Sequence, residues 1–234
     1  MKNNIQDKTK LVNSVFSKVY KKYDLMNDVM SLGIHRIWKD KYINWLNPSP
    51  NSNLIDVASG TGDIAKLFSN YIDHSAKITC VEPNNEMFEE GKKNLKKYKN
   101  IEWIKAAAEG LPIKDNSFDY YTISYGIRNV SDINKTLKEA YRVLKIGGRF
   151  MCLEFSKIDN EALNFLYKQY SKIIPIAGKY IVGSSKPYEY LVESIDSFYN
   201  QKQICELMIK NGFSNVEYRN LSNGISAIHS GWKI

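Results

Sequence analysis

Cysteine is scarce in this chain, and its scarcity limits what can hold the fold together. The 234 residues contain three cysteines, Cys80, Cys152 and Cys205, which lie far apart in the sequence. An odd number of isolated cysteines supports neither a disulfide framework nor a cysteine-rich zinc site. We therefore expect a protein of a reducing compartment whose stability comes from a packed core, which a chain of this length can bury.

Long apolar runs are also missing. No uninterrupted hydrophobic stretch approaches the roughly 20 residues that span a bilayer. The first ten residues are polar and contain neither the apolar segment of a secretory signal nor the arginines of a mitochondrial transit peptide. With 43% hydrophobic and 12% aromatic residues, the chain is too apolar to be disordered. The composition predicts a globular protein of the cytoplasm.

Arginine is rare among the basic residues. Only five of the 33 basic residues are arginine, and the net charge is +8. A general preference for lysine and asparagine explains this charge better than nucleic-acid binding does, although a lysine-rich surface would attract anionic lipid headgroups. An arginine retained in such a chain is expected where a planar, permanently charged group is needed. The arginines are Arg36, Arg128, Arg142, Arg149 and Arg219.

The most informative motif is a short apolar run followed by two glycines. The run that starts at Leu54 reads as a buried strand, Gly60 and Gly62 mark a tight turn, and helical spacing of apolar residues begins after Gly62. Glycines let a loop backbone approach a ligand closely, and the start of the next helix presents free N–H groups. This strand–loop–helix pattern predicts a nucleotide-like cofactor at the loop.

Carboxylates around this loop discriminate between cofactors. The spacing of Gly60, Gly62 and Ala65 also satisfies a loose dinucleotide fingerprint, which is weak by itself. Asp56 ends the strand, where it can order the loop and approach a cationic amino-acid group, whereas Asp63 puts a negative charge where a pyrophosphate would bind. S-adenosylmethionine (SAM) therefore fits better, because it carries an ammonium and a sulfonium but no phosphate. A glycine-rich turn without a ligand is the remaining alternative.

Further candidate residues follow other predicted strands. Glu82 ends a strand over residues 77–82, about 20 residues after the glycines, where an acidic side chain can accept hydrogen bonds from both hydroxyls of a ribose. Ala107 and Ala108 lie in a turn of small residues after a strand over 101–105, which leaves room for a flat adenine. Because ligands of a parallel sheet bind at the carboxyl ends of its strands, these residues are expected to converge.

The alternation of strand and helix patterns predicts an α/β fold. Parallel strands joined by helices form a doubly wound, Rossmann-like sheet. A final antiparallel hairpin, with its turn at Ser222 and Asn223, completes a mostly parallel seven-stranded sheet in one domain over residues 1–234. The later predicted strands are 118–124, 149–155, 216–221 and 224–230, and the predicted helices include 84–98, 132–145 and 200–211.

Two segments outside this alternation are candidates for covering a substrate. Residues 1–48 predict an N-terminal helical lid, rich in Met and aromatic residues, whose helix over 35–46 ends before Pro48. Residues 157–200 predict a substrate-cap insertion with a helix that ends before Pro175. Ordinary packing against the sheet is an equal alternative for both segments.

Several of these stretches resemble one family of enzymes. The glycine-loop motif from Asp56 to Asp63 and the terminal hairpin resemble the class I SAM-dependent methyltransferases. More specifically, the chain is similar to the quinone C-methyltransferases of ubiquinone and menaquinone biosynthesis over nearly its whole length. The segments that carry this similarity are 23–38, 126–130, 142–156, 188–195 and 231–233.

The resemblance implies SAM as the cofactor and places its contacts. It assigns Glu82 to the ribose, and adds Thr61 in the glycine loop and Ser124 after the fourth strand. Many relatives carry Asp in place of Glu82 and Asn in place of Ala107, so a longer carboxylate and one lost side-chain contact are expected here. The expected SAM-binding residues are Asp56, Gly60, Thr61, Gly62, Glu82, Ala107, Ala108 and Ser124.

The resemblance also implies methylation of a ring carbon of a polyprenylated quinol, either 2-methoxy-6-polyprenyl-1,4-benzoquinol or demethylmenaquinol. The ring gains electron density when a phenol loses its proton, at a cost of about 4 kcal/mol at neutral pH. A fixed positive charge beside the phenolate offsets part of this cost, and Arg128 is the first candidate. Asn129 would orient the ring or a water, and His35 and Tyr23 are weaker candidates for accepting the proton. No metal is required.

Composition and resemblance together define the expected partners. These are a polyprenyl quinol and the inner surface of a membrane, which the protein contacts peripherally; a homo-oligomer or a quinone-synthesis complex stays open. Two rival functions remain, a catalytically silent SAM-binding scaffold and a nucleic-acid methyltransferase. The stretch 124–129, Ser-Tyr-Gly-Ile-Arg-Asn, disfavours the second because it lacks an Asn-Pro-Pro-Tyr-type base-flipping motif.

Overall fold

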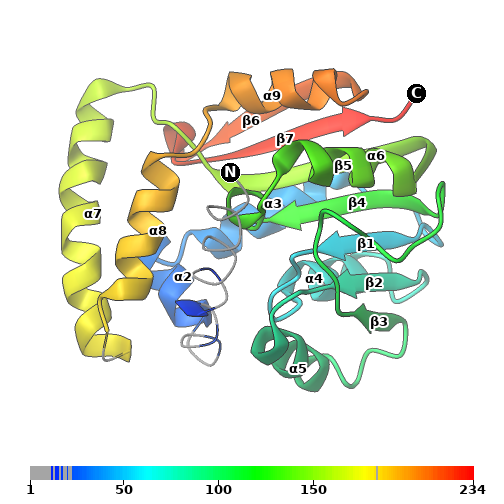
Figure 1. The fold of residues 1–234 in the computed structure, drawn as a ribbon, viewed down its shortest axis with the longest axis horizontal. Helices are drawn as coiled ribbons and strands as arrows, with labels where there is room; N and C mark the ends of the chain where they lie inside the picture. Colours follow the sequence, from blue (N-terminus) through cyan, green and yellow to red (C-terminus); the bar gives the residue numbers. More distant parts are fainter. Residues whose placement is uncertain (1–11, 13, 16, 18–19, 21–22, 183) are drawn as a thin grey trace.

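A seven-stranded sheet lies at the centre of the protein (Figure 1). The computed structural model describes residues 12, 14, 15, 17, 20, 23–182 and 184–234. The strands are β1 (Leu54–Val57), β2 (Ile78–Val81), β3 (Ile101–Ile104), β4 (Phe118–Ser124), β5 (Leu144–Phe155), β6 (Ser214–Leu221) and β7 (Ser226–Trp232). Their order across the sheet is β3-β2-β1-β4-β5-β7-β6. The first five strands pair in parallel, whereas β7 is antiparallel to both β5 and β6.

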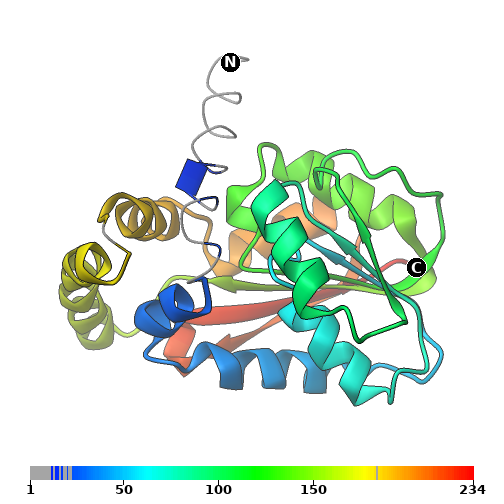
Figure 2. The same cartoon turned by 90° about the horizontal axis from the view of Figure 1, so that it is seen from below.

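Helices cover both faces of this sheet (Figure 2). α3 (His35–Leu46) and α4 (Asp63–Tyr71) pack on one face, and α6 (Ile133–Val143) and α9 (Gln201–Lys210) pack on the other. The other elements are α2 (Tyr23–Ser31), α5 (Asn85–Asn94), α7 (Glu161–Val182), α8 (Lys186–Asp196) and the short 3-10 helices η2 (Ile127–Asn129) and η3 (Ser222–Gly224). The predicted doubly wound α/β sheet with a C-terminal antiparallel hairpin is confirmed.

The central strands are short and almost entirely apolar. All four residues of β1 and all four of β2 are buried, as expected for parallel strands that are covered on both faces. Asp56 is the one charged residue within β1, and its exposed fraction is 1%. A carboxylate in the middle of a buried strand is costly unless it is paired, so its presence points to a specific role.

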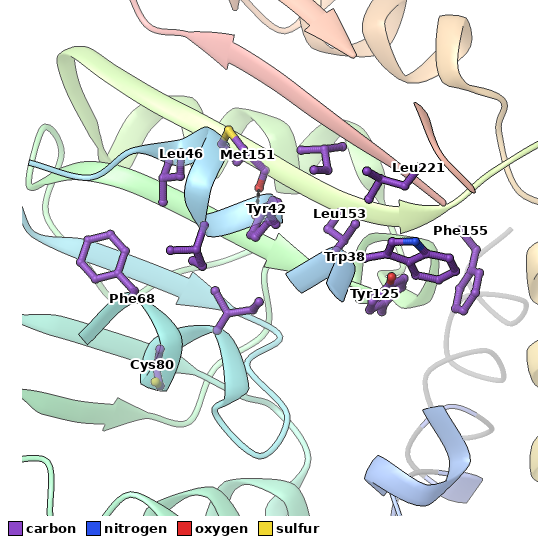
Figure 3. Close-up of a cluster of buried hydrophobic side chains, with 14 of the residues drawn as sticks. Trp38, Tyr42, Leu46, Phe68, Cys80, Tyr125, Met151, Leu153, Phe155 and Leu221 are labelled. Atoms are coloured by element: carbon purple, nitrogen blue, oxygen red, sulfur yellow. Dashed lines mark hydrogen bonds between the residues drawn. The ribbon is translucent and has the colours of Figure 1, made fainter. Parts of the chain in front are cut away.

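The N-terminal helix α3 contributes to the main core. Figure 3 shows Trp38 and Tyr42 of α3 lying against β5, where the Tyr42 hydroxyl donates a hydrogen bond to the Met151 carbonyl over 2.7 Å. The Trp38 ring meets Phe155 edge-on, with 6.2 Å between their centroids. The segment 35–46 of the predicted lid is thus packed against the sheet. Residues 1–22 of the predicted lid fall mostly outside the described residues.

Helices α2, α7 and α8 stand beside the carboxyl edge of the parallel strands (Figure 1). The predicted end of a helix before Pro175 is wrong, because α7 continues through this proline to Val182. A proline inside a helix removes one backbone hydrogen bond, but the turn that follows packs closely on α8. A Cβ atom added to Gly178 would lie 2.1 Å from the Tyr188 ring. Tertiary contact therefore continues the helix beyond its local stop signal.

Three predicted boundaries differ from the observed ones. The helix predicted over 132–145 ends at Val143, and β5 begins at Leu144, five residues earlier than expected, because Leu144 pairs with Phe118. The helix predicted over 84–98 ends at Asn94. A pairing partner that is distant in the sequence thus sets the start of β5, whereas α5 ends in a local turn in which the Leu95 N–H donates to the Gly91 and Lys93 carbonyls.

Candidate active site

The glycine loop is held in place by a carboxylate from the neighbouring strand. Gly60 and Gly62 both adopt positive φ angles, 57° and 88°, which glycine accommodates without steric cost. The Gly60 N–H donates to Glu82 Oε2 and the Asn84 N–H to Glu82 Oε1, each over 2.9 Å. Burial raises the pKa of Glu82 to about 7 although both backbone hydrogen bonds lower it. Because each carboxylate oxygen can accept a second hydrogen bond, Glu82 can still receive a ligand hydroxyl.

A cavity of about 160 Å³ lies beside this loop and gathers several predicted residues. Glu82, Ala107 and Ala108 line it together with Gly60 and Asn129. Its other walls include Pro83, Met87 and Tyr125, which are mostly apolar. Small residues on one side and a carboxylate on the other match the shape and polarity of an adenosine.

A smaller cavity of about 20 Å³ continues past the glycine loop to the end of β1. Asp56, Thr61 and Ser124, three of the residues predicted to bind SAM, line it. Asp56 Oδ1 accepts a hydrogen bond from the Thr122 hydroxyl over 2.7 Å, but Asp56 Oδ2 is buried without a hydrogen-bond partner among the described residues. Burial raises the pKa of Asp56 to about 7. An unsatisfied buried carboxylate oxygen at this position suits an ammonium group.

Lys39 also lines the smaller cavity, and the sequence analysis missed it. Its exposed fraction is 6%, and its Nζ lies 2.6 Å from Asp63 Oδ2 at the start of α4. Burial opposes ionisation of Asp63, but the attraction of Lys39 holds the pKa of that carboxyl below its usual value. One signal could have found it: Lys39 shares the buried face of α3 with Tyr42, Ile43 and Leu46, where a surface lysine is not expected.

Gly62 allows the backbone conformation and close packing of the loop, and it makes no contact with the two cavities. It precedes α4, and a Cβ atom there would lie 2.5 Å from the Leu95 side chain. It does not line either of the two cavities beside the glycine loop. Its assignment as a SAM-contacting residue therefore has no support in this geometry, whereas Gly60 lines both.

Arg128 pairs with a buried carboxylate, a contact that was not predicted from the sequence. Its side chain is buried, its guanidinium donates to Glu154 Oε1 over 2.6 Å and to the Tyr125 carbonyl over 2.8 Å, and it lies 5.6 Å from the Phe155 ring centroid. Burial raises the pKa of Glu154, while Arg128 lowers it. The positive charge predicted for a substrate phenolate is thus balanced within the protein. These contacts order the segment after β4, and a direct role of Arg128 beside the phenolate stays a prediction.

Asn129 lines the larger cavity, whereas the roles of the two candidate proton acceptors stay predictions. The Tyr190 hydroxyl of α8 donates to Asn129 Oδ1 over 2.9 Å, which fixes the amide at the wall of the larger cavity. His35 Nε2 instead lies 2.9 Å from Asp28 Oδ1, and His35 lines neither cavity beside the glycine loop. Burial lowers the pKa of His35. Tyr23 begins α2, but its side chain lies outside the described part of the structure.

Relatives with similar sequences cover nearly the whole chain. The "Ubiquinone/menaquinone biosynthesis C-methyltransferase UbiE" of Rickettsia bellii (strain OSU 85-389) is 53% identical over 97% of this chain and 94% of its own length. The protein of the same name from Brucella suis is 49% identical over 97% of this chain and 87% of its own length. These similarities extend over the glycine loop, both cavities and the helices beside them.

Solved structures share the fold at much lower identity. A SAM-dependent methyltransferase from Thermotoga maritima matches with a TM-score of 0.66 and 21% identity, covering 94% of this chain and 99% of that one. Haemonchus contortus phosphoethanolamine N-methyltransferase 2, in complex with S-adenosyl-L-methionine, matches with a TM-score of 0.63 and 15% identity over 84% and 52% of the chains. The model of the ubiE/COQ5 methyltransferase family matches residues 2–233. The chain belongs to the ubiE/COQ5 methyltransferase family.

Proposed function

We propose that this protein transfers the methyl group of SAM to a ring carbon of a polyprenylated benzoquinol or naphthoquinol. Its relatives are named for C-methylation in ubiquinone and menaquinone biosynthesis at 49–53% identity. The observation that carries the proposal is Asp56 Oδ2, which is buried beneath the glycine loop without a hydrogen-bond partner in the described part of the chain. It lies next to the cavity lined by Glu82 and the two alanines. Such a site suits a cationic nucleoside without phosphate.

In this proposal, the residues around the two cavities would contact SAM along its whole length. Glu82 would accept the ribose hydroxyls, and Ala107 and Ala108 would leave space for adenine. Asp56 Oδ2 would receive the ammonium and Lys39 Nζ the carboxylate of the amino-acid end, so that both charges meet an opposite charge. When bound there, SAM supplies an electrophilic methyl group on a positively charged sulfur.

The protein's own contribution to the methyl transfer is mainly positioning. Tyr125 lines both cavities and packs on Phe155 with 4.8 Å between the ring centroids, which gives an aromatic wall for a flat ring. Asn129, fixed by Tyr190, would orient a quinol oxygen. Holding donor and acceptor in line is worth about 7–11 kcal/mol, more than a single charged group supplies. Arg128 would act through the backbone that it holds.

We further propose that the protein works in the cytoplasm with peripheral contact to the membrane, because a polyprenyl tail partitions into lipid. Assembly with other quinone-synthesis proteins, or into a homo-oligomer, is compatible with this placement. The described helices include none that combines the length and apolarity of a bilayer-spanning segment.

The proposal is tested by supplying purified protein with SAM carrying a labelled methyl group and with short-chain versions of either quinol. We expect label on a ring carbon of at least one of them, and none when the quinone is left oxidised, because only the quinol can give a phenolate. Asp56→Ala is expected to lose SAM binding and turnover together. SAM binding without turnover of either quinol would favour the catalytically silent scaffold.

A further inference from the structure

One face of α7 exposes large apolar side chains to solvent. Phe165, Leu166, Ile173, Ile176 and Tyr180 are 58–86% exposed. Their spacing places them along one stripe of the helix, since residues three and four apart share a face. The opposite side of the helix is packed, with Ile174 1% exposed. Exposed apolar side chains gathered in this way mark an interaction site more often than isolated ones do.

Lysines border this stripe on one side. Lys168, Lys172 and Lys179 are exposed and project from the helix face next to the apolar one, and Glu161 in the first turn is the one acidic residue of α7. The acidic residues Glu189, Glu193 and Asp196 belong to α8, where they line the cavity between the two helices. The apolar stripe of α7 is therefore bordered by a row of lysines, of which Lys168 and Lys172 line the same cavity as these carboxylates.

The position of α7 leaves this face open. Figures 1 and 2 show α7 as the outermost helix at the carboxyl edge of the sheet, with α8 and α2 on its inner side. A cavity of about 590 Å³ lies between α7 and α8, and Lys168 and Lys172 stand on its wall. Its inner walls include Met30 and Ile158. Two of the lysines that border the apolar stripe thus also border this cavity.

We propose that the outer face of α7 docks on the anionic surface of a lipid bilayer, with its apolar stripe in the interfacial layer and its lysines at the headgroups. This inference deepens the proposed function, because a membrane-bound polyprenyl substrate has to reach the site from the bilayer. Amphipathic helices with this division of apolar and lysine residues lie in the plane of the interface. A second copy of the chain fits less well, because a two-fold contact would bring the same lysine rows together.

The test is co-sedimentation of the full-length protein with vesicles of phosphatidylcholine alone or mixed with phosphatidylglycerol. We expect stronger binding to the mixed vesicles, and weaker binding as salt is added. Ile176→Gln combined with Tyr180→Gln should lower affinity for both vesicle types roughly 10- to 100-fold, because the apolar area is lost. The triple variant Lys168→Gln/Lys172→Gln/Lys179→Gln should have a roughly 100-fold lower affinity for the mixed vesicles. Its affinity for the neutral vesicles should be nearly unchanged.

The matched control is Ile209→Gln on α9. Ile209 is 60% exposed, as is Ile176, but it lies on α9, which packs along β6 and β7 and apart from α7 (Figure 1). This variant should bind vesicles as the wild type does. Retained SAM binding and an unchanged melting temperature show that each variant is folded.

Three results would overturn the inference: no vesicle binding by the wild type, equal loss in the Ile209 control, or wild-type binding by the α7 variants. A dimer that the α7 double variant dissociates, without any vesicle binding, would assign the face to self-association instead. Turnover of a short-chain, water-soluble quinol should be unaffected by the α7 changes. If the wild type does not turn over this quinol at all, the result counts against the proposed function and not against the lipid contact.

Discussion

Buried charge serves two purposes around the active site. Arg128 and Glu154 lie 2.6 Å apart and neutralise each other, so they contribute order to the segment between β4 and η2. Asp56 keeps one carboxylate oxygen without a partner among the described residues, which makes it costly to the empty protein and available to a cation. The Arg128–Glu154 pair is neutral without a ligand, whereas Asp56 needs the positive charge of a ligand to complete its hydrogen bonds. Only Asp56 is expected to respond directly to SAM.

Substitutions can separate the structural role of Arg128, as the partner of Glu154, from a direct role of its positive charge in catalysis. Arg128→Ala leaves Glu154 buried without its partner, and is expected to destabilise the fold by about 3–5 kcal/mol. Replacing both residues by Gln removes the charges but keeps groups that can hydrogen-bond. We expect Arg128→Gln/Glu154→Gln to retain quinol methylation within roughly tenfold, measured as kcat alongside SAM affinity. A loss of roughly 1,000-fold with SAM binding intact would show that the guanidinium stabilises the phenolate directly.

At the scale of elements, α3 links the N-terminal segment to the cofactor site. Its Trp38 and Tyr42 pack on β5, and the neighbouring Lys39 reaches Asp63 at the start of α4. The same helix therefore builds the core and supplies a cation to the small cavity. An element predicted as part of a lid is an integral wall of the site.

The contribution of α3 can be measured with two ligands. Lys39→Met is expected to weaken binding of SAM or S-adenosylhomocysteine by roughly 10- to 100-fold, because a charge-assisted hydrogen bond to their carboxylate is lost. Binding of 5′-methylthioadenosine, which has no amino-acid end, should change little in calorimetry. Lys41→Met, an exposed position on the same helix, serves as the control. Equal weakening of all ligands would instead assign Lys39 to the fold of the loop.

At the scale of the whole molecule, the parallel sheet brings distant segments to one edge. The loops after β1, β2 and β4 and the helix α3 meet around the two cavities, and α8 adds Tyr190 from the other end of the sequence. This concentration has an electrostatic consequence, because Asp56 and Glu82 are both buried there with pKa values raised to about 7. The stability of the protein and its affinity for SAM should depend on pH in opposite directions.

The raised pKa of Asp56 determines whether the stability of the folded protein rises or falls with pH. The folded protein keeps a proton that the unfolded chain releases near its ordinary value of 3.8, so the stabilisation by that proton is lost as the pH rises through about 7. Asp56→Asn should therefore gain melting temperature relative to the wild type when the pH is raised from about 5 to about 8.

SAM affinity of the wild type should fall by up to about tenfold per pH unit below 7, as Asp56 is protonated, and this dependence should weaken in the Asn variant. Calorimetry and thermal melts over the same pH series measure both effects. A constant difference in melting temperature would show that Asp56 does not titrate in this range.

The sequence by itself determined the order of strands and helices, the glycine loop and the alignment of Asp56, Thr61, Glu82 and the two alanines at one edge. These features depend on local patterns, namely apolar periodicity, turn residues and the start of a helix, which a short window of sequence contains. Only the tertiary structure decided what happens to the charges. Lys39 meets Asp63 across 24 positions, and Arg128 meets Glu154 across 26. Because the partner of such a charge lies far away in the sequence, no local pattern reveals the pairing. Likewise, α7 continues through Pro175 because it packs on α8, and this contact cannot be read from the sequence around the proline.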